Sequence, residues 1–136
     1  MVVRPMVLPR VMVVEDSAEL RQLFARVLDR TAVEHVTVPD AASALAALDE
    51  QEFALVLLDK RLGASSGLEV LARLRADPRH RATRVVMMSG DPPGGRSGEG
   101  PEPDSYLMKP VGVHQLVDVV RTQLAAFDEA EPSEGP

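Results

Sequence analysis

One short stretch, residues 53–59, constrains the fold of this chain more than any other. It runs Phe-Ala-Leu-Val-Leu-Leu-Asp, six apolar residues followed directly by a carboxylate. An apolar run without alternation predicts a strand that is buried on both faces, as in a parallel sheet covered by helices. In open α/β sheets, ligands bind at the carboxyl ends of the strands. Asp59 stands at that point, although a lone Asp after a strand more often only caps a turn.

Strands and helices are expected to alternate along the rest of the chain. The strands are predicted at residues 10–14, 35–38, 53–58, 84–88 and 106–108, and the helices at residues 20–28, 41–48, 67–75 and 113–126. This alternation predicts an α/β fold with a doubly wound, five-stranded parallel sheet and right-handed crossovers. The flavodoxin-like strand order 2-1-3-4-5 fits, and it brings Glu15 and Asp16 beside Asp59.

Composition narrows the class of protein and its partners. The 136 residues make one domain, expected at 10–126, with a loose arm at 1–9 and an acidic, disordered tail at 127–136. The net charge of −6 argues against nucleic acid as a direct partner. Without cysteine there is no disulfide framework, and no apolar run approaches the roughly 20 residues that span a bilayer. We therefore expect a cytoplasmic protein with no membrane partner.

Three carboxylates are predicted to meet at one edge of the sheet. Glu15 and Asp16 follow the first strand, and Asp59 follows the third. Carboxylates brought together repel one another, and burial adds to the cost of their charge. A hard divalent cation such as Mg²⁺ relieves this, because it prefers oxygen ligands. The alternative is that each acid is separately solvated or caps a helix, as Asp16 does if it forms a capping box with Glu19.

Two further polar residues end neighbouring strands. Ser89 follows the fourth strand and offers a hydroxyl donor, while Lys109 follows the fifth and can reach Asp59 or a phosphoryl group. The bond from Lys109 to Pro110 has only a modest trans preference, so a cis bond can fix the direction of the lysine. Alone, either residue is more often a turn or surface residue. The three histidines, His35, His80 and His114, are scattered and expected at the surface.

Over about residues 10–126, this set of motifs resembles the receiver domains of response regulators in two-component signalling. The matching motifs are Val-Val-Glu-Asp-Ser at 13–17, Asp59 with Leu62 and Gly67, Met-Met-Ser-Gly at 87–90, and Tyr-Leu-Met-Lys-Pro at 106–110. The resemblance implies that a histidine kinase or a phosphotransfer protein donates a phosphoryl group to Asp59.

The resemblance also assigns roles to the other residues of the set. Asp16 and Asp59 would bind Mg²⁺ directly, Glu15 through water, and Arg61 through its backbone carbonyl. Ser89 would donate a hydrogen bond to the phosphoryl group and Lys109 would pair with it. Tyr106 would be an aromatic switch that turns inward when Ser89 moves; the alternative is half-buried packing on the strand.

The sequence departs from the receiver pattern near Asp59. Gly63 stands where the family usually has proline, and the cations Lys60 and Arg61 directly follow the acceptor. We expect these cations to modulate the site, with Arg61 forming an ion pair with Asp91 over its mouth. This hypothesis is wrong if Asp91→Ala leaves the lifetime of the acyl phosphate unchanged.

The largest departure is residues 90–104, where a receiver domain has its fourth helix. Five glycines and four prolines in this segment would cost a helix about 17 kcal/mol relative to alanine. We therefore expect a mobile loop in place of the helix. Such a loop either orders on phosphorylation or partner binding, or is a passive linker.

The sequence suggests three candidate functions. The leading one is a single-domain response regulator that is phosphorylated on Asp59 in a Mg²⁺-dependent reaction and signals through altered contacts with a downstream protein. The second is a pseudo-receiver, a constitutive interaction module that does not need phosphorylation. A phosphohydrolase is disfavoured, because Arg61 stands where such enzymes place a second Asp as general acid.

Overall fold

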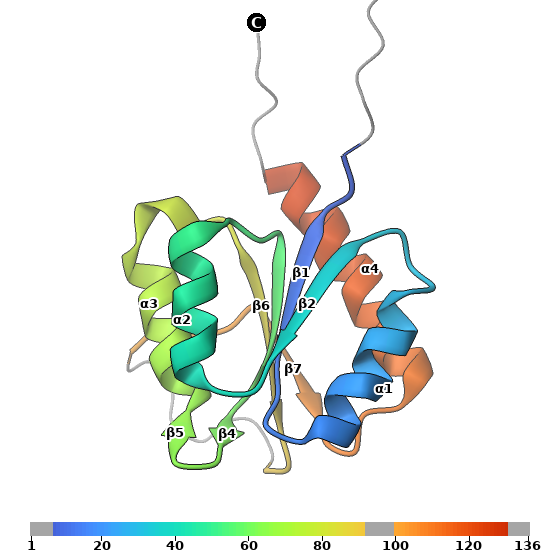
Figure 1. Cartoon of the computed structure of the whole chain (residues 1–136). Helices are drawn as coiled ribbons and strands as arrows, with labels where there is room; N and C mark the ends of the chain where they lie inside the picture. The colour runs from blue at the N-terminus through green and yellow to red at the C-terminus, as the bar shows by residue number, and fades with distance from the viewer. Residues whose placement is uncertain (1–6, 92–99, 131–136) are drawn as a thin grey trace, which may run out of the picture.

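The computed structural model describes residues 7–91 and 100–130, and Figure 1 shows its α/β architecture. Five parallel strands form one sheet in the order β2-β1-β3-β6-β7. The strands are β1 Arg10–Val14, β2 Glu34–Val38, β3 Leu55–Asp59, β6 Arg84–Ser89 and β7 Ser105–Met108. Counted by sheet strands alone, this is the predicted order 2-1-3-4-5, so the predicted fold class is confirmed.

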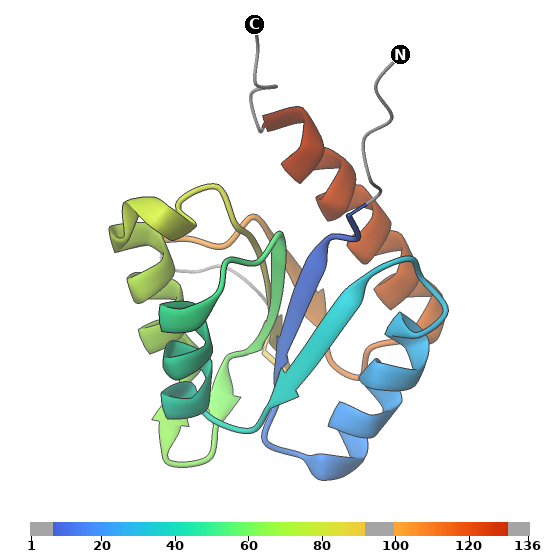
Figure 2. The ribbon, with the colours of Figure 1, turned by 45° about the horizontal axis from the view of Figure 1, so that its top comes forward.

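Two pairs of helices cover the two faces of the sheet, as Figures 1 and 2 show. The helices are α1 Ala18–Leu28, α2 Ala41–Glu50, α3 Gly67–Ala76 and α4 Val113–Ala130. The central strand alternates between two cores: Leu57 packs with Phe24 and Leu116 of α1 and α4, whereas Leu58 packs with Leu48 and Leu71 of α2 and α3. Burial on both faces explains why β3 is apolar without alternation.

Hydroxyl and carboxylate caps fix where the helices begin. Ser17 caps α1 by accepting a hydrogen bond from the Leu20 N–H, and Asp40 caps α2 through the Ser43 N–H. The alternative in which Asp16 caps this helix is therefore wrong, because Ser17 is the cap and the helix begins at Ala18. The carboxylate of Asp16 is left free of the helix, at the end of the sheet where the other acids lie.

The loop at 60–66 and the chain end differ in detail from expectation. Residues 60–66 contain a small antiparallel hairpin of β4 Arg61–Leu62 and β5 Ser65–Ser66. The last helix runs to Ala130, so the prediction of a disordered tail beginning at residue 127 is wrong for residues 127–130. The half-buried Phe127 extends the apolar face of this helix by one turn. The rest of the predicted tail, and residues 1–6 of the arm, lie outside the described residues.

His80 is buried, contrary to the expectation of a surface residue. It ends the short 3₁₀ helix η1 Pro78–His80 and is 1% exposed. Its Nε2 lies 2.9 Å from the carbonyl oxygen of Leu48, near the end of α2. Carbonyls in the last turn of a helix lack partners within the helix, so the ring satisfies one of them. His114 is exposed and His35 is partly buried.

The predicted absence of a fourth helix at residues 90–104 falls partly outside the described residues. Residues 90–91 and 100–104 carry no helix, whereas residues 92–99 lie outside the described residues. Over the described ranges the sheet is thus covered by four α-helices. In the same ranges, none of the helices is both long enough and apolar enough to cross a membrane.

Candidate functional site

The predicted site residues come together at the carboxyl ends of four neighbouring strands. Glu15 follows β1, Asp59 ends β3, Ser89 ends β6 and Lys109 follows β7. The parallel register pairs Val14 with Leu58, Asp59 with Met88, and Ser89 with Met108, so these strand ends lie at one level. They border an open pocket of about 520 Å³, lined by Asp16, Asp59, Arg61, Gly63, Ser89, Gly90, Asp91 and Lys109.

Three carboxylates form a compact cluster at this pocket. Oxygen atoms of Glu15, Asp16 and Asp59 all lie within 4.8 Å of one another. Glu15 and Asp59 are buried, with 1% and 4% exposed, whereas Asp16 is exposed. A backbone N–H orients each buried acid: that of Ser17 donates to Glu15 Oε2 at 3.1 Å, and that of Arg61 to Asp59 Oδ1 at 3.1 Å.

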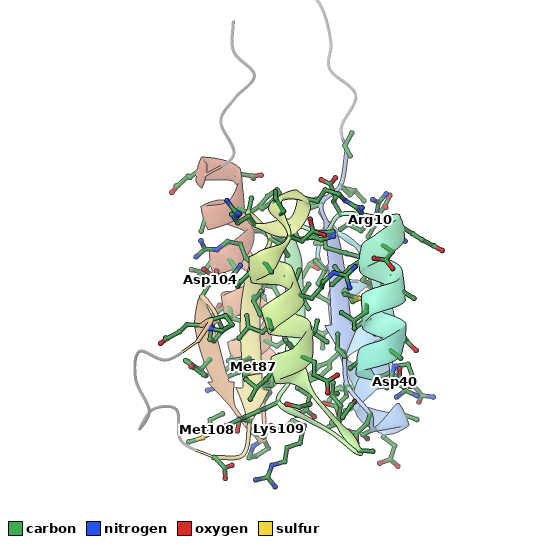
Figure 3. All side chains as sticks on the ribbon, turned by 90° about the vertical axis from the view of Figure 1, so that its left-hand side faces the viewer. Arg10, Asp40, Met87, Asp104, Met108 and Lys109 are labelled. Atoms are coloured by element: carbon green, nitrogen blue, oxygen red, sulfur yellow. The ribbon has the colours of Figure 1, made fainter. Side chains whose placement is uncertain are left out.

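Lys109 bridges the two buried acids. Its Nζ donates to Asp59 Oδ2 at 2.7 Å and to Glu15 Oε1 at 3.1 Å. The backbone N–H of Lys109 donates to the carbonyl of Ser89 at 2.8 Å, which joins the lysine to the neighbouring strand. The peptide bond to Pro110 is cis. Figure 3 shows Lys109 beside Met108 at this end of the sheet.

Burial and pairing act against each other on the ionisation of this cluster. Burial raises the pKa of Glu15, and the charge of Asp59 adds to this, while hydrogen bonds from the Ser17 N–H and Lys109 offset part of the rise. Burial alone would lower the pKa of Lys109, but its hydrogen bonds to Asp59 and Glu15 and the negative charges of these acids together outweigh burial and raise it. The lysine is therefore held as an ammonium ion between the two acids.

The charges of the cluster fit a divalent cation. Three carboxylates face one ammonium group, which leaves two negative charges when all are ionised. Oxygen donors of this kind suit Mg²⁺ or another hard cation. The ammonium group occupies one oxygen of Glu15 and one of Asp59, whereas the side chain of Asp16 makes no hydrogen bond within residues 7–91 and 100–130.

Two of the three residues that we expected to modulate the site, Arg61 and Asp91, lie at the mouth of the pocket. Arg61 Nη2 and Asp91 Oδ2 form the expected ion pair, 3.2 Å apart, and both side chains are largely exposed. The Ser89 hydroxyl accepts a hydrogen bond from the Asp91 N–H at 3.0 Å, so the serine also contacts this rim. Lys60 is partly buried and does not line the pocket. Tyr106 is 43% exposed on β7 and likewise lies outside the pocket lining.

Two contacts of the site were not predicted from the sequence, although Gly67 stands in one of the matching motifs. A Cβ atom at Gly67 would lie 2.3 Å from the carbonyl oxygen of Asp59, so only glycine allows α3 to begin this close to Asp59. The guanidinium of Arg21 donates to the carbonyls of Glu15 and Asp16. Its position one turn after Ser17 is the only signal the sequence holds, and arginines on a helix surface are too common for that to suffice.

Comparison with protein families decides the identity of this arrangement. Residues 11–121 match the model of the response regulator receiver domain. The chain belongs to this family. The receiver domain is 34% identical over 131 residues to the DNA-binding response regulator MtrA of Mycolicibacterium paratuberculosis, covering 92% of this chain and 55% of that protein. It is 32% identical over 110 residues to the phosphate regulon transcriptional regulatory protein PhoB of Escherichia coli, covering 79% of this chain and 48% of PhoB.

The chain thus spans about half the length of these relatives. Among solved structures, the chemotaxis response regulator CheY4 of Vibrio cholerae superposes with a TM-score of 0.79 at 21% identity, covering 86% of this chain and 99% of that one. The receiver domain of the Pseudomonas aeruginosa sensor kinase PA1611, with magnesium in its active-site cleft, gives a TM-score of 0.76 at 18% identity, covering 88% and 99%. At these identities the likeness shows a shared fold.

Proposed function

We propose that this receiver domain accepts a phosphoryl group on Asp59 from a histidine kinase or a phosphotransfer protein, and that the transfer requires Mg²⁺. The observation that carries the proposal is the Lys109 ammonium bound to both Asp59 and Glu15 beside the exposed Asp16. This arrangement combines a carboxylate nucleophile, a cation for the incoming phosphoryl group, and excess negative charge for a metal ion.

Asp59 acts as the nucleophile in the proposed reaction. One of its carboxylate oxygens attacks the phosphorus atom and a P–O bond forms. The bond from phosphorus to the donor's histidine nitrogen breaks, and the electron pair stays on that nitrogen, which takes up a proton. The Arg61 N–H, 3.1 Å from Asp59 Oδ1, restricts rotation of the carboxylate, so the attacking group is oriented before the donor arrives.

The cation would be held by Asp16 and Asp59 directly, by Glu15 through water and by the backbone carbonyl of Arg61. Such an ion would neutralise charge on the transferring phosphoryl oxygens. The burial of Glu15 and its hydrogen bonds to Lys109 and the Ser17 N–H support an indirect role for this acid. The ammonium group of Lys109 would form an ion pair with the added phosphoryl oxygens, and the hydroxyl of Ser89 would donate a hydrogen bond to them.

The output proposed for the domain is altered contact with a downstream protein. Phosphorylation adds negative charge and strong hydrogen-bond acceptors at Asp59. Ser89 and Lys109 would move toward these acceptors, and the segments that carry them would follow. In this proposal Tyr106, on the strand that leads to Lys109, changes its exposure when Ser89 moves.

Intact-mass measurement after treatment with a small phosphodonor tests the proposal. With Mg²⁺ present, the wild-type chain gains the mass of one phosphoryl group, and a chelator suppresses the gain. Asp59→Asn gains none, whereas the matched variant Asp91→Asn, which changes another carboxylate of the same pocket, is still phosphorylated. A wild-type chain that folds, binds Mg²⁺ and gains no mass would instead be a pseudo-receiver.

A further inference from the structure

Arg21 contacts the main chain of the turn formed by Glu15 and Asp16, not the carboxylates of these two acids. This residue lies on α1, and its Nη1 donates to the carbonyl oxygen of Glu15 at 2.8 Å and to that of Asp16 at 3.1 Å. Arginine near acids commonly pairs with their carboxylates. Here the guanidinium bonds the main chain of both acids, so the oxygen atoms of the two side chains stay available to other groups.

The three acids differ in what fixes their side chains. The side chain of Asp59 accepts hydrogen bonds from Lys109 and the Arg61 N–H, and that of Glu15 accepts them from Lys109 and the Ser17 N–H. Over the described part of the chain, the carboxylate of Asp16 accepts none. Its position therefore depends on the orientation of its backbone, and Arg21 is the side chain that holds the carbonyl of that residue.

We propose that Arg21 is a positioning residue for the metal site, which fixes the turn so that Asp16 presents its carboxylate to a divalent cation. This inference rests on the Mg²⁺ site proposed above and adds a determinant of its affinity. Groups that orient metal ligands typically change metal affinity 10- to 100-fold when they are mutated. We expect about a tenfold loss here, because Glu15 has other partners for its side chain and only Asp16 depends on Arg21 for its position.

Charge and positioning predict opposite signs, which makes the test sharp. Removing a positive charge near the acids strengthens the attraction for a cation, so a purely electrostatic role would lower the Kd of the Arg21→Gln variant for Mg²⁺. A positioning role raises the Kd. Arg26→Gln is the matched control, because Arg26 lies on the same helix, is exposed, and loses the same charge.

Calorimetric titration of the full chain with MgCl₂ gives the decisive numbers. We expect a Kd about tenfold higher in Arg21→Gln and unchanged or slightly lower in Arg26→Gln. In the Asp16→Asn background, Arg21→Gln should add little, because the side chain that Arg21 positions no longer offers a carboxylate. An equal effect in both backgrounds would show that Arg21 acts on the fold rather than through Asp16, and would overturn the inference.

Arg21→Lys keeps the test decisive if Arg21→Gln does not fold. Lysine preserves the charge but not the planar guanidinium, so we expect weaker Mg²⁺ binding than in the wild type despite equal charge. If Arg21→Lys binds Mg²⁺ as tightly as the wild type, or Arg21→Gln binds it more tightly, the positioning role is overturned. The proposed metal site would remain. A wild-type chain that does not bind Mg²⁺ overturns the proposed metal site itself.

Discussion

The two ends of strand β7 carry charge clusters of opposite sign: one cation between two acids at one end, and one acid between two cations at the other. Lys109, directly after the strand, lies between the carboxylates of Glu15 and Asp59. Asp104, directly before it, lies between two guanidinium groups: Arg75 Nη2 is 2.8 Å from Asp104 Oδ2, and Arg84 Nη1 is 3.4 Å from Oδ1. Figure 3 shows Asp104 and Lys109 at opposite ends of the strand. A four-residue edge strand is thus held by ion pairs at both ends.

The two clusters differ in whether every charged side chain has a hydrogen-bond partner. At the Asp104 end, the backbone adds two hydrogen bonds: the Val85 N–H donates to Asp104 Oδ2, and the Asp104 N–H donates to the Val85 carbonyl, each at 2.8 Å. At the Lys109 end, Asp16 adds a third carboxylate and leaves excess negative charge. At the Asp104 end, the guanidinium groups of Arg75 and Arg84 also donate to the carbonyl of Thr83 and to the side chain of Gln123, so their excess positive charge is held by hydrogen bonds. At the Lys109 end, the carboxylate of Asp16 accepts no hydrogen bond within the described ranges and can therefore bind a ligand.

The largest effect is expected at the Asp104 end. Asp104→Asn removes the charge between two guanidinium groups and weakens the bond to the Val85 N–H, so it should lower the free energy of unfolding by about 2–3 kcal/mol. Urea denaturation measures this loss. The Kd for Mg²⁺, measured where the variant is folded, should not change. A shift in Kd without loss of stability would reverse the assignment of the two ends.

Lys109→Met tests the other end. Removing the ammonium group leaves three negative charges instead of two, so Mg²⁺ should bind more tightly, by about 1 kcal/mol or about fivefold. Phosphorylation of Asp59 should nevertheless slow, because the cation that pairs with the incoming group is lost. Calorimetry and the rate of mass gain check the two effects. Weaker Mg²⁺ binding in this variant would show that the lysine orients the acids more than it competes for them.

The pH dependence of stability gives a smaller effect. Because burial raises the pKa of Glu15 above 4.5, this group binds its proton more tightly in the folded chain. Its contribution to stability is therefore full below pH 4.5 and is lost as the pH rises through the raised pKa. With a chelator present, the free energy of unfolding of the wild type should fall relative to Glu15→Gln from pH 4.5 toward pH 7. If the free energy of unfolding of the wild type instead rises with pH relative to that of Glu15→Gln, the hydrogen bond from Lys109 holds the pKa of Glu15 below 4.5.

The smallest effect on stability is expected for the exposed Arg61–Asp91 pair. Exposed pairs contribute about 0.2–1 kcal/mol, so Asp91→Ala should barely change the free energy of unfolding. The same energy at the pocket mouth corresponds to an acyl-phosphate lifetime that is shorter by a factor of about 1.4 to 5, measured by loss of the mass gain. Asp49→Ala, which breaks the distant ion pair with Arg73, is the control and should leave the lifetime unchanged.

Much of the fold could be predicted because its signals are local. The apolar run at 53–58 and the helical spacing around Leu20 and Phe24 depend on neighbouring residues, and strand order then places Asp59 beside Glu15. The site followed from the topology, since parallel strands bring their carboxyl ends together.

What could not be predicted depends on contacts across long separations. His80 is buried because a carbonyl 32 residues earlier accepts its hydrogen bond. The role of Asp104 depends on Arg75 of α3 and Arg84 of β6, and no local pattern marks either arginine. The helical turn beyond residue 126 was missed because the acidic residues Asp128 and Glu129 outweighed the apolar Phe127 in the composition.

The close contact at Gly67 has a mechanical consequence. Helix α3 begins against the main chain of Asp59, where a Cβ atom would lie 2.3 Å from its carbonyl oxygen, and carries Arg75 to Asp104 in its last turn. A rod of ten residues, about 15 Å long, therefore joins the proposed phosphorylation site to the ion-pair cluster that holds the start of β7. If the main chain of Asp59 moves toward this helix, the far end of the rod must move as well unless the helix bends.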